Sequence, residues 1–364
     1  MAITSILAFI VMLVVLVFVH ELGHFIVALR MGIKVEEFGI GFPPRAATLF
    51  EHKGVKYTLN WLPLGGFVRF GGEGDTVYGV GSLAEAPPWR KIPVMLAGPL
   101  MNLFLAMAIF AVIFRVSGYP VELDTYSINA VFAGSPAAEA GFQADDILLS
   151  LNGEAIAKDG DVSRIASSNK GVTIPAVVER NGVQETLMVT PGPWTDKDGN
   201  TYESGLGIAY APTIGYTPVN TFEAIGKGIS YSLSALSKMI EDISALIGGL
   251  FTGNKEVEGG LAGPIGIARV TDEVIDRGGM PAFWRLAALL SINLFLINLL
   301  PIPALDGSHI LFSLIEWVRG GKKVPPEKEA LVHAIGFIAL MTLMLVVSIS
   351  DIMQAIRGES ILGS

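Results

Sequence analysis

Two histidines and a glutamate near the start of the chain have the spacing of a hydrolytic zinc site. His20, Glu21 and His24 form a His-Glu-x-x-His motif. On a helix, side chains four residues apart share a face, so both histidines can bind one Zn²⁺. Glu21 lies beside them, where a carboxylate can act on metal-bound water. The motif therefore predicts zinc-dependent hydrolysis, with one Zn²⁺ per chain.

The motif lies in an apolar run that is long enough to cross a bilayer. Residues 3–19 carry no charge, and the next basic residue after the motif is Arg30. At about 1.5 Å per residue, His20 lies roughly 25 Å along such a helix and His24 roughly 9 Å from its other end. Ionisable groups at this depth are costly and are functional by default, which disfavours an accidental pair of core histidines.

A distant segment supplies a candidate third ligand. Residues 298–307 read Asn-Leu-Leu-Pro-Ile-Pro-Ala-Leu-Asp-Gly at the end of another apolar run. Two prolines one residue apart break a helix, and Asp306 then reaches a position where it could complete a two-His, one-carboxylate site with a fourth position for water. Eight Lys and Arg residues in 30–91 and a basic group after Asp306 put both segments at the cytoplasmic side.

The composition is that of a polytopic membrane protein. Hydrophobic residues make up 51% of the 364 residues and charged residues 16%. The chain has no cysteine, which excludes disulfides, thiolate zinc ligands and cysteine nucleophiles. The first apolar segment lacks a basic start and a cleavage site, which argues against a removable signal peptide.

The loop after the first span is predicted to form a membrane-associated β-hairpin. Residues 54–62 and 65–72 alternate like strands and are joined by Pro63-Leu64. A substrate peptide could add a strand to the free edge, with Gly65, Gly66 and Phe67 as candidate contacts. A plain surface hairpin is the alternative, and the residue pattern does not decide between the two.

A single amide interrupts the second span. Residues 94–114 are broken near their start by Ala97-Gly98-Pro99 and contain Asn102. Glycine beside proline allows a neighbouring helix to approach closely, so we expect Asn102 to face the protein interior. It is a candidate substrate contact, and a helix-packing hydrogen bond is the alternative.

Between the second and third spans the chain becomes acidic and alternates like a soluble domain. Residues 118–282 hold 10 Lys and Arg against 21 Asp and Glu. Gly-Ser-Pro-Ala-Ala at 134–138 is typical of a short helix start, and Asp-Ile-Leu-Leu-Ser-Leu-Asn-Gly at 146–153 of a strand and turn. These segments resemble a protease-associated PDZ domain. Such a domain could bind an extended peptide or chain terminus, or only block access.

The remaining segment before the third span has helical periodicity. Residues 222–251 are long enough to span, but two acidic residues in their interior favour an amphipathic helix at the outer surface. Gly259 to Ile267 is predicted to be a breaker-rich loop.

We therefore predict a polytopic α-helical membrane protein with about four transmembrane helices, a membrane-associated β-hairpin and one inserted extracytoplasmic PDZ-like (α+β) domain. Both chain termini are predicted to be extracytoplasmic. The expected parts are the first transmembrane helix 1–30, a cytoplasmic hairpin loop 31–93, the second helix 94–117, the PDZ-like domain 118–215, an amphipathic helix and Gly-rich loop 216–281, the third helix 282–307, a cytoplasmic loop 308–330, and the fourth helix and tail 331–364.

Together these motifs resemble the site-2 protease family of intramembrane zinc metalloproteases, in its bacterial RseP-type branch. The resemblance covers essentially the whole chain, and it implies that His20, His24 and Asp306 bind zinc, that Glu21 is the general base and that Asn298 lies at the substrate site. It also implies a bacterial inner membrane location and substrates that are single-pass membrane proteins, such as anti-sigma factors, or remnant signal peptides. Two departures are Ser308, where the family often has glycine, and a single PDZ-like module, where some members have two.

Two other functions are compatible with parts of the sequence. A non-catalytic scaffold could capture partner tails through the PDZ-like module and keep a vestigial metal site. A metal transporter would need polar sites through several spans, whereas here they converge at one depth. Nucleic acid is not an expected partner, because the soluble part is acidic. We expect His309 and His333 to be structural or interfacial and His52 to be solvated.

Overall fold

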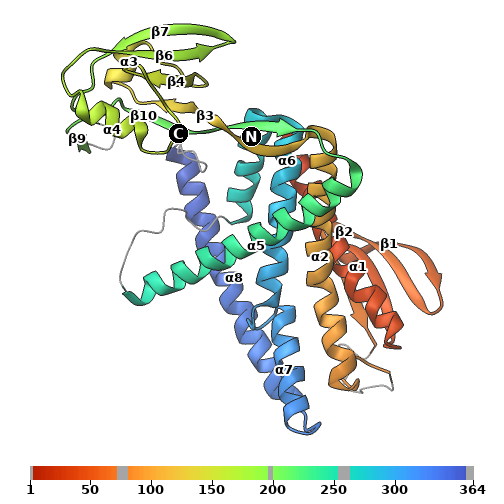
Figure 1. The fold of residues 1–364 in the computed structure, drawn as a ribbon. Helices are drawn as coiled ribbons and strands as arrows, with labels where there is room; N and C mark the ends of the chain where they lie inside the picture. Colours follow the sequence, from red (N-terminus) through yellow and green to blue (C-terminus); the bar gives the residue numbers. More distant parts are fainter. Residues whose placement is uncertain (1–2, 72–80, 196–199, 253–262, 358–364) are drawn as a thin grey trace. The chain divides into compact units, whose positions relative to one another are not determined.

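The computed structural model describes residues 3–71, 81–195, 200–252 and 263–357 (Figure 1). They divide into two units. Residues 117–218 form one unit, and the segments before and after them form the other. The chain therefore leaves the helical unit once and returns to it, as expected for an inserted domain.

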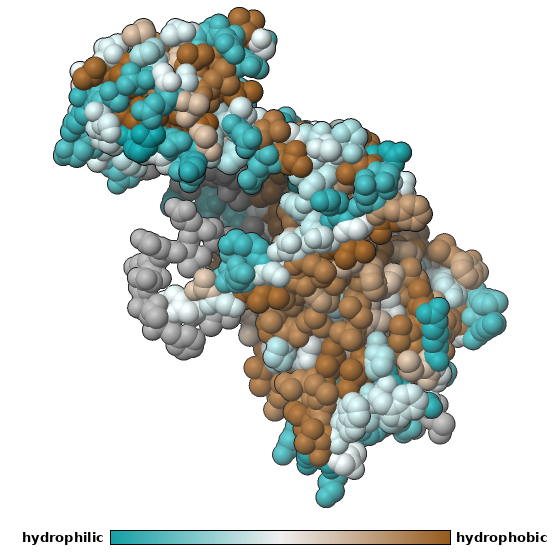
Figure 2. Space-filling view, in the orientation of Figure 1, coloured by the Kyte–Doolittle hydropathy of each residue, from teal (hydrophilic) through white to brown (hydrophobic). Residues whose placement is uncertain are grey.

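Four long apolar helices dominate the described part of the helical unit. Each is long and apolar enough to cross a membrane, and apolar side chains gather over this unit in Figure 2. The most apolar part of the last helix has no buried residue, which is typical of a helix that contacts lipid. The predicted polytopic membrane fold is confirmed. The helices are α1 (Ile3–Arg30), α2 (Pro88–Ser117), α6 (Pro264–Leu299) and α8 (Pro326–Arg357).

The helix α6 begins earlier than the sequence predicted. We expected a loop over 259–267 and a third helix from 282, but the helix starts at Pro264, a residue type well suited to a first helical position. The carboxylate of Asp351 on α8 accepts hydrogen bonds from the backbone N–H groups of Gly263 and Gly266, at 3.0 and 2.8 Å. A cap supplied from α8 thus stabilises this helix start, and the rest of the predicted loop, 259–262, lies outside the described residues. The same helix is kinked at Gly279, whose φ is 61°.

Among the described residues, this unit has two further helices. The helix α5 (Thr221–Thr252) covers the predicted amphipathic segment and packs its start onto α2, with Tyr231 against Phe110 at 4.7 Å between ring centres. The helix α7 (Asp306–Val318) lies in the segment predicted to be a loop from 308. That prediction was wrong, because the acidic residue in its first turn and the two positive-φ glycines after it favour a short helix.

The hairpin of the helical unit is built from other strands than the two predicted ones. It is formed by β1 (Val35–His52) and β2 (Val55–Phe70), which are joined at Lys53-Gly54. Both turn residues have positive φ, 51° and 79°, as the favoured two-residue hairpin turn requires. The two predicted strands and the Pro63-Leu64 link are all part of β2. Our prediction missed β1, because its Pro43-Pro44 pair reads as a strand breaker.

The long strands fold over so that the hairpin presents four segments. Residues 35–40 pair with 66–70 on one side and with 56–59 on the other, and 45–52 then pair with the outer side of 55–60. The segment 66–70 is consequently an edge of this sheet.

The described part of the inserted unit has one main antiparallel sheet, a separate two-stranded sheet of β8 and β9, and two short helices. Its main strands lie in the order β10-β3-β4-β6-β7, with β5 beside β4, and a continuous apolar core lies under them. This arrangement agrees with the predicted PDZ-like domain. The elements are β3 (Tyr119–Val131), α3 (Pro136–Ala140), β4 (Ile147–Leu151), β5 (Glu154–Ala155), α4 (Asp161–Ser168), β6 (Ile174–Arg180), β7 (Val183–Val189), β8 (Trp194–Thr195), β9 (Thr201–Tyr202) and β10 (Ile208–Thr217).

Local signals in this unit correspond to the predicted ones. Ser135 caps α3 by accepting a hydrogen bond from the backbone N–H of Ala138 at 3.2 Å, and Gly141 ends the helix with a φ of 85°. Asn152 and Gly153, with φ of 52° and 78°, form the tight turn from β4 to β5.

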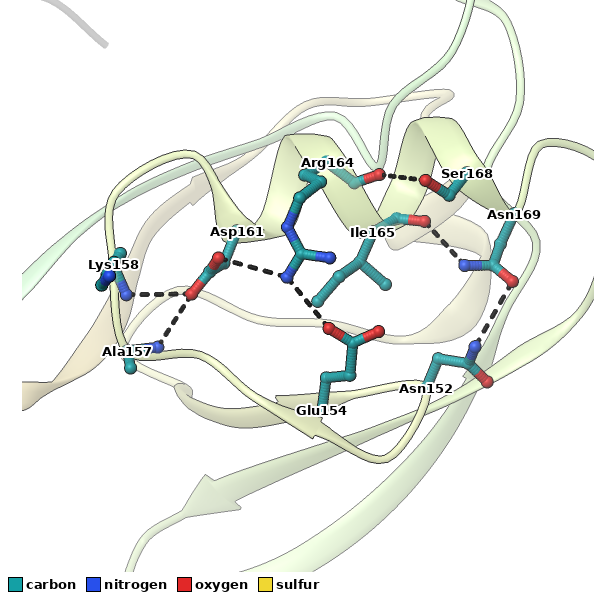
Figure 3. A network of polar contacts seen from close by, with 9 residues as sticks. All are labelled: Asn152, Glu154, Ala157, Lys158, Asp161, Arg164, Ile165, Ser168 and Asn169. Carbon is teal, nitrogen blue, oxygen red and sulfur yellow. Dashed lines mark hydrogen bonds and ion pairs between the residues drawn. The ribbon is translucent and has the colours of Figure 1, made fainter.

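A surface network holds α4 against the β4–β5 turn (Figure 3). Asp161 accepts hydrogen bonds from the backbone N–H groups of Ala157 and Lys158, and Arg164 donates to both Asp161 and Glu154. These bonds fix the loop before α4. The N-cap residue of this helix is Gly160, which has no side chain to make a capping hydrogen bond.

Candidate metal centre

The first two candidate ligands are neighbours on one face of α1. His20 and His24 are both buried, and their Nε2 atoms lie 3.1 Å apart. Residues four apart on a helix are stacked on the same face, so local geometry alone brings the two nitrogens together.

A break in the chain brings the third candidate ligand to the same point. Asp306 is the first residue of α7, directly after the segment that Pro301 and Pro303 keep out of helix. Its Oδ2 atom lies 3.0 Å from Nε2 of His20 and 3.3 Å from Nε2 of His24. The structure therefore brings together the three residues that were expected to bind zinc.

The size of this triangle fits a zinc ion. Ligands at about 2.0–2.1 Å from a tetrahedral Zn²⁺ lie roughly 3.3 Å from one another. The three observed separations, 3.0, 3.1 and 3.3 Å, are close to that value. Three protein ligands leave one tetrahedral position for water, which is the arrangement of a catalytic rather than a structural zinc site.

Helix α2 fixes the orientation of the His24 ring. Nδ1 of His24 lies 2.7 Å from the backbone carbonyl of Val94, and a carbonyl can only accept, so Nδ1 carries the proton. The lone pair of Nε2 then points to Asp306 and His20. Gly98 leaves the space for this ring, since a Cβ atom there would overlap Nε2 of His24. Close approach at the predicted Gly-Pro position thus accommodates the ring of a candidate metal ligand.

Asn102 is completely buried beside the other histidine. Its side-chain amide lies 3.2 Å from Nδ1 of His20, and its backbone carbonyl accepts a hydrogen bond from Ser291 at 2.8 Å. Oδ1 of Asn102 has no partner within the described parts of the chain. The amide can turn this oxygen toward Nδ1–H of His20, which satisfies both groups and leaves the lone pair of Nε2 for a metal.

With both Nδ1 atoms protonated, the centre contains only electron-pair donors. Oδ2 of Asp306 is buried and has no hydrogen-bond partner among the described residues, although both Nε2 atoms are near. Three lone pairs at about 3 Å repel one another unless a cation lies between them. The donor set therefore fits a bound Zn²⁺.

Glu21 lies beside the three candidate ligands and is not part of that group. Its carboxylate is close to His20, His24 and Asp306 and accepts a hydrogen bond from the backbone N–H of Val68. Glu21 can therefore exchange a proton with a group at the metal.

The edge segment of the hairpin passes along Glu21. Gly66 lies in this segment, and a Cβ atom there would lie 2.9 Å from the carbonyl of Gly39 and 3.7 Å from Cγ of Glu21. Gly65 precedes it with a φ of 93° beside Val17, and the half-buried Phe67 follows it. These are the three hairpin residues that were predicted to contact substrate.

A buried carboxylate ties the hairpin segments together. Glu37 accepts hydrogen bonds from Thr58 at 2.8 Å and from Arg45 at 2.7 Å, and Arg69 of the edge segment lies 3.1 Å away. Burial alone would raise the pKa of Glu37, but these hydrogen bonds and the two positive charges outweigh it and lower the pKa below 4.5. The edge segment is thus held by charge as well as by strand pairing.

Asn298 is half-buried near the end of α6. Its side-chain amide donates a hydrogen bond to the carbonyl of Leu294 at 3.0 Å, one turn earlier on the same helix. This leaves Oδ1 as the group that could meet a substrate.

A second group of two histidines and a carboxylate is formed by residues of α7 and α8. His309 of α7, with Glu329 and His333 of α8, offers ligand atoms that all lie within 4.8 Å of one another. The rings of His309 and His333 are stacked, with 4.3 Å between their centres. Both residues were expected to be structural or interfacial.

Sequence reasoning missed the groups that orient the ligands. The Val94 carbonyl has no side-chain signature. A separate contact that was missed is the part-buried ion pair between Lys91 of α2 and Glu316 of α7, at 2.8 Å, which joins residues 225 positions apart. The positive-inside rule predicted only that the segments containing these two residues lie on the same side of the membrane.

Comparison with known proteins gives a consistent result. Residues 8–343 match the model of peptidase family M50. A Brucella suis biovar 1 protein whose name assigns it to the zinc metalloproteases is 34% identical, over 96% of this chain and 95% of its own length. The regulator of sigma-W protease RasP of Bacillus subtilis is 30% identical (97% and 99%), and zinc metalloprotease RasP of Bacillus licheniformis is 31% identical (96% and 99%).

Among solved structures, a PDZ domain of an SdrC-like protein from Listeria monocytogenes matches with a TM-score of 0.21 and 23% identity. It covers 25% of this chain and 92% of that domain. Because this score is low, the PDZ-like assignment rests on the sheet order and the caps described above.

Proposed function

The chain belongs to peptidase family M50, and from this premise we propose the roles of its residues in an intramembrane zinc metalloprotease. The enzyme is of the site-2 protease type, depends on zinc and acts on membrane proteins in the bilayer of a bacterial inner membrane. The comparisons give no support to the scaffold alternative.

His20, His24 and Asp306 are the proposed zinc ligands. The observation that carries this proposal is the triangle of Nε2, Nε2 and Oδ2 with sides of 3.0–3.3 Å, which matches the spacing of ligands around a tetrahedral zinc ion. A zinc ion bound there lowers the pKa of water and polarises a scissile carbonyl. The Val94 carbonyl keeps the proton of His24 on Nδ1, and Asn102 does the same for His20 when its amide is turned so that Oδ1 faces the ring; Nε2 of both histidines is then free for the metal.

Glu21 is the proposed general base. It takes a proton from the attacking water and delivers it to the leaving amine, because its carboxylate lies beside the ligands without being one of them. Such proton transfer contributes about 10²–10⁴-fold to a rate.

The edge segment 66–70 is the proposed substrate-binding strand. A transmembrane substrate must unwind before its carbonyls can react, since a helix keeps them in hydrogen bonds. An extended substrate can pair with this edge, at Gly65, Gly66 and Phe67, next to Glu21. Asn298 is a further candidate contact, whereas the burial of Asn102 favours a role in orienting His20.

The finer assignments follow from charge and chain order. We propose single-pass membrane proteins or remnant signal peptides as substrates, and a peptide or chain terminus as ligand of the PDZ-like unit. The eight basic residues in 30–91 favour a cytoplasmic hairpin, with the termini and the PDZ-like unit on the other side.

The test measures zinc content together with cleavage of a single-pass substrate in the native chain and in Glu21→Gln. We expect one zinc per chain in both and a 10²–10⁴-fold loss of cleavage in the variant, because glutamine cannot accept the proton. Equal activity of Glu21→Gln would refute the role of Glu21. Absence of zinc from the native protein would refute the metal site.

A further inference from the structure

The segment that presents Asp306 has little regular structure of its own. Between the end of α6 and the start of α7 it makes short turns, such as the hydrogen bond from the N–H of Leu305 to the carbonyl of Ile302 at 3.1 Å. Ala304 has a φ of 75°, which is uncommon for a residue other than glycine and costs energy. A conformation of this kind persists only if neighbouring groups hold it.

One such neighbour is a histidine on α8. The backbone N–H of Ala304 donates a hydrogen bond to Nδ1 of His333 at 3.0 Å. Close packing follows one turn further on α8, where a Cβ atom at Gly336 would lie 3.0 Å from the carbonyl oxygen of Pro303. The strained residue is thus clamped two positions before Asp306.

The same hydrogen bond argues against a second metal site at His309, Glu329 and His333. A backbone N–H can only donate, so Nδ1 of His333 must keep its lone pair and the ring proton must be on Nε2. Nε2–H then faces the carboxylate of Glu329, at 3.9 Å from Oε1. A protonated nitrogen is not a metal ligand, and therefore this group lacks three free electron pairs.

We propose that His333 is a positioning residue for the metal centre. As a hydrogen-bond acceptor, it holds Ala304 in the conformation that directs Asp306 toward His20 and His24. The inference rests on the proposed role of Asp306 as a zinc ligand, and it adds α8 to the elements that maintain the site.

The test exploits the two nitrogens of the ring. In His333→Asn the side-chain oxygen can occupy the place of Nδ1 and accept from Ala304, whereas in His333→Gln it occupies the place of Nε2. Both variants lose the ring and its stacking on His309, so they differ mainly in the position of the acceptor. Zinc affinity of the purified full-length proteins is measured by competition with a chelator, together with cleavage at saturating zinc.

We expect His333→Gln to bind zinc on the order of tenfold more weakly. Residues that orient metal ligands change affinity by about 10–100-fold, and the low end applies here because His333 acts through the backbone. His333→Asn should stay close to the native affinity. Equal affinities of the two variants, whether native-like or reduced, would overturn the proposal. Asp306→Ala serves as the reference: if it keeps native zinc affinity, the proposed ligand set itself fails, which is a separate outcome.

Discussion

Two groups in this molecule each bring two histidines and one carboxylate within 4.8 Å of one another: His20, His24 and Asp306, and His309, Glu329 and His333. In the first group the ring nitrogen turned away from the centre faces a carbonyl at Val94 or an amide at Asn102. In the second group, the corresponding nitrogen of His333, Nδ1, faces the backbone N–H of Ala304.

This difference decides which group can hold a metal. An acceptor next to Nδ1 keeps the ring proton on Nδ1, which leaves the lone pair of Nε2 free. A donor next to Nδ1 keeps the proton on Nε2 instead. Exposure adds to the contrast, since the His309 side chain is 44% exposed and the His24 side chain 6%. Residue type and proximity are therefore not sufficient evidence for a metal site.

The strongest test of the contrast removes one carboxylate from the first group. In Asp306→Ala we expect zinc content to fall from one per chain to near zero and cleavage to background, because two histidines alone form an incomplete site. Metal analysis after dialysis against a weak chelator measures this effect. Retention of a full zinc equivalent would show that another group supplies the third ligand.

A smaller but still large loss of zinc affinity is expected when the contact between α2 and the His24 ring is disturbed. Alanine is about 1 kcal/mol better than glycine in a helix, yet in Gly98→Ala the added Cβ overlaps the His24 ring. We expect at least tenfold weaker zinc binding, since the ring must move. Gly226→Ala on α5 is the control, because among the described residues no atom beyond its chain neighbours and its own helix backbone lies within 4 Å of its Cβ position. Equal zinc affinity of both variants would contradict the close packing.

Removing the hydrogen-bond partner of His20 should weaken zinc binding by an intermediate amount. Removing the amide in Asn102→Ala leaves Nδ1 of His20 without its partner, and we expect about 10–100-fold weaker zinc binding. Asn102→Asp keeps an acceptor oxygen and should lose less. Competition with a chelator measures both, and a larger loss in the aspartate variant would mean that the amide donates to the ring.

The smallest effect is expected in the second group. Glu329→Gln should leave zinc at one per chain and change the free energy of unfolding by less than about 1 kcal/mol, as for partly exposed ion pairs. Metal analysis and thermal unfolding provide the two values. A native content of two zinc ions that falls to one in this variant would reverse the comparison.

Much of this molecule follows from rules that act over a few residues. The pairing of His20 with His24 needs only helical periodicity, the four spans need only long apolar runs, and the caps at Ser135 and Gly141 need only local hydrogen bonding. A break after α6 was likewise predictable from its prolines, because proline cannot continue a helix.

Other features depend on packing between segments far apart in sequence. The hairpin register pairs 66–70 with 35–40, α6 starts where Asp351 caps it, and His24 is oriented by a carbonyl 70 residues away. Backbone carbonyls and N–H groups are present at nearly every residue, so no sequence pattern marks the one that will face a given ring. Whether a histidine offers its lone pair to a metal or to a backbone N–H is consequently settled by tertiary contacts.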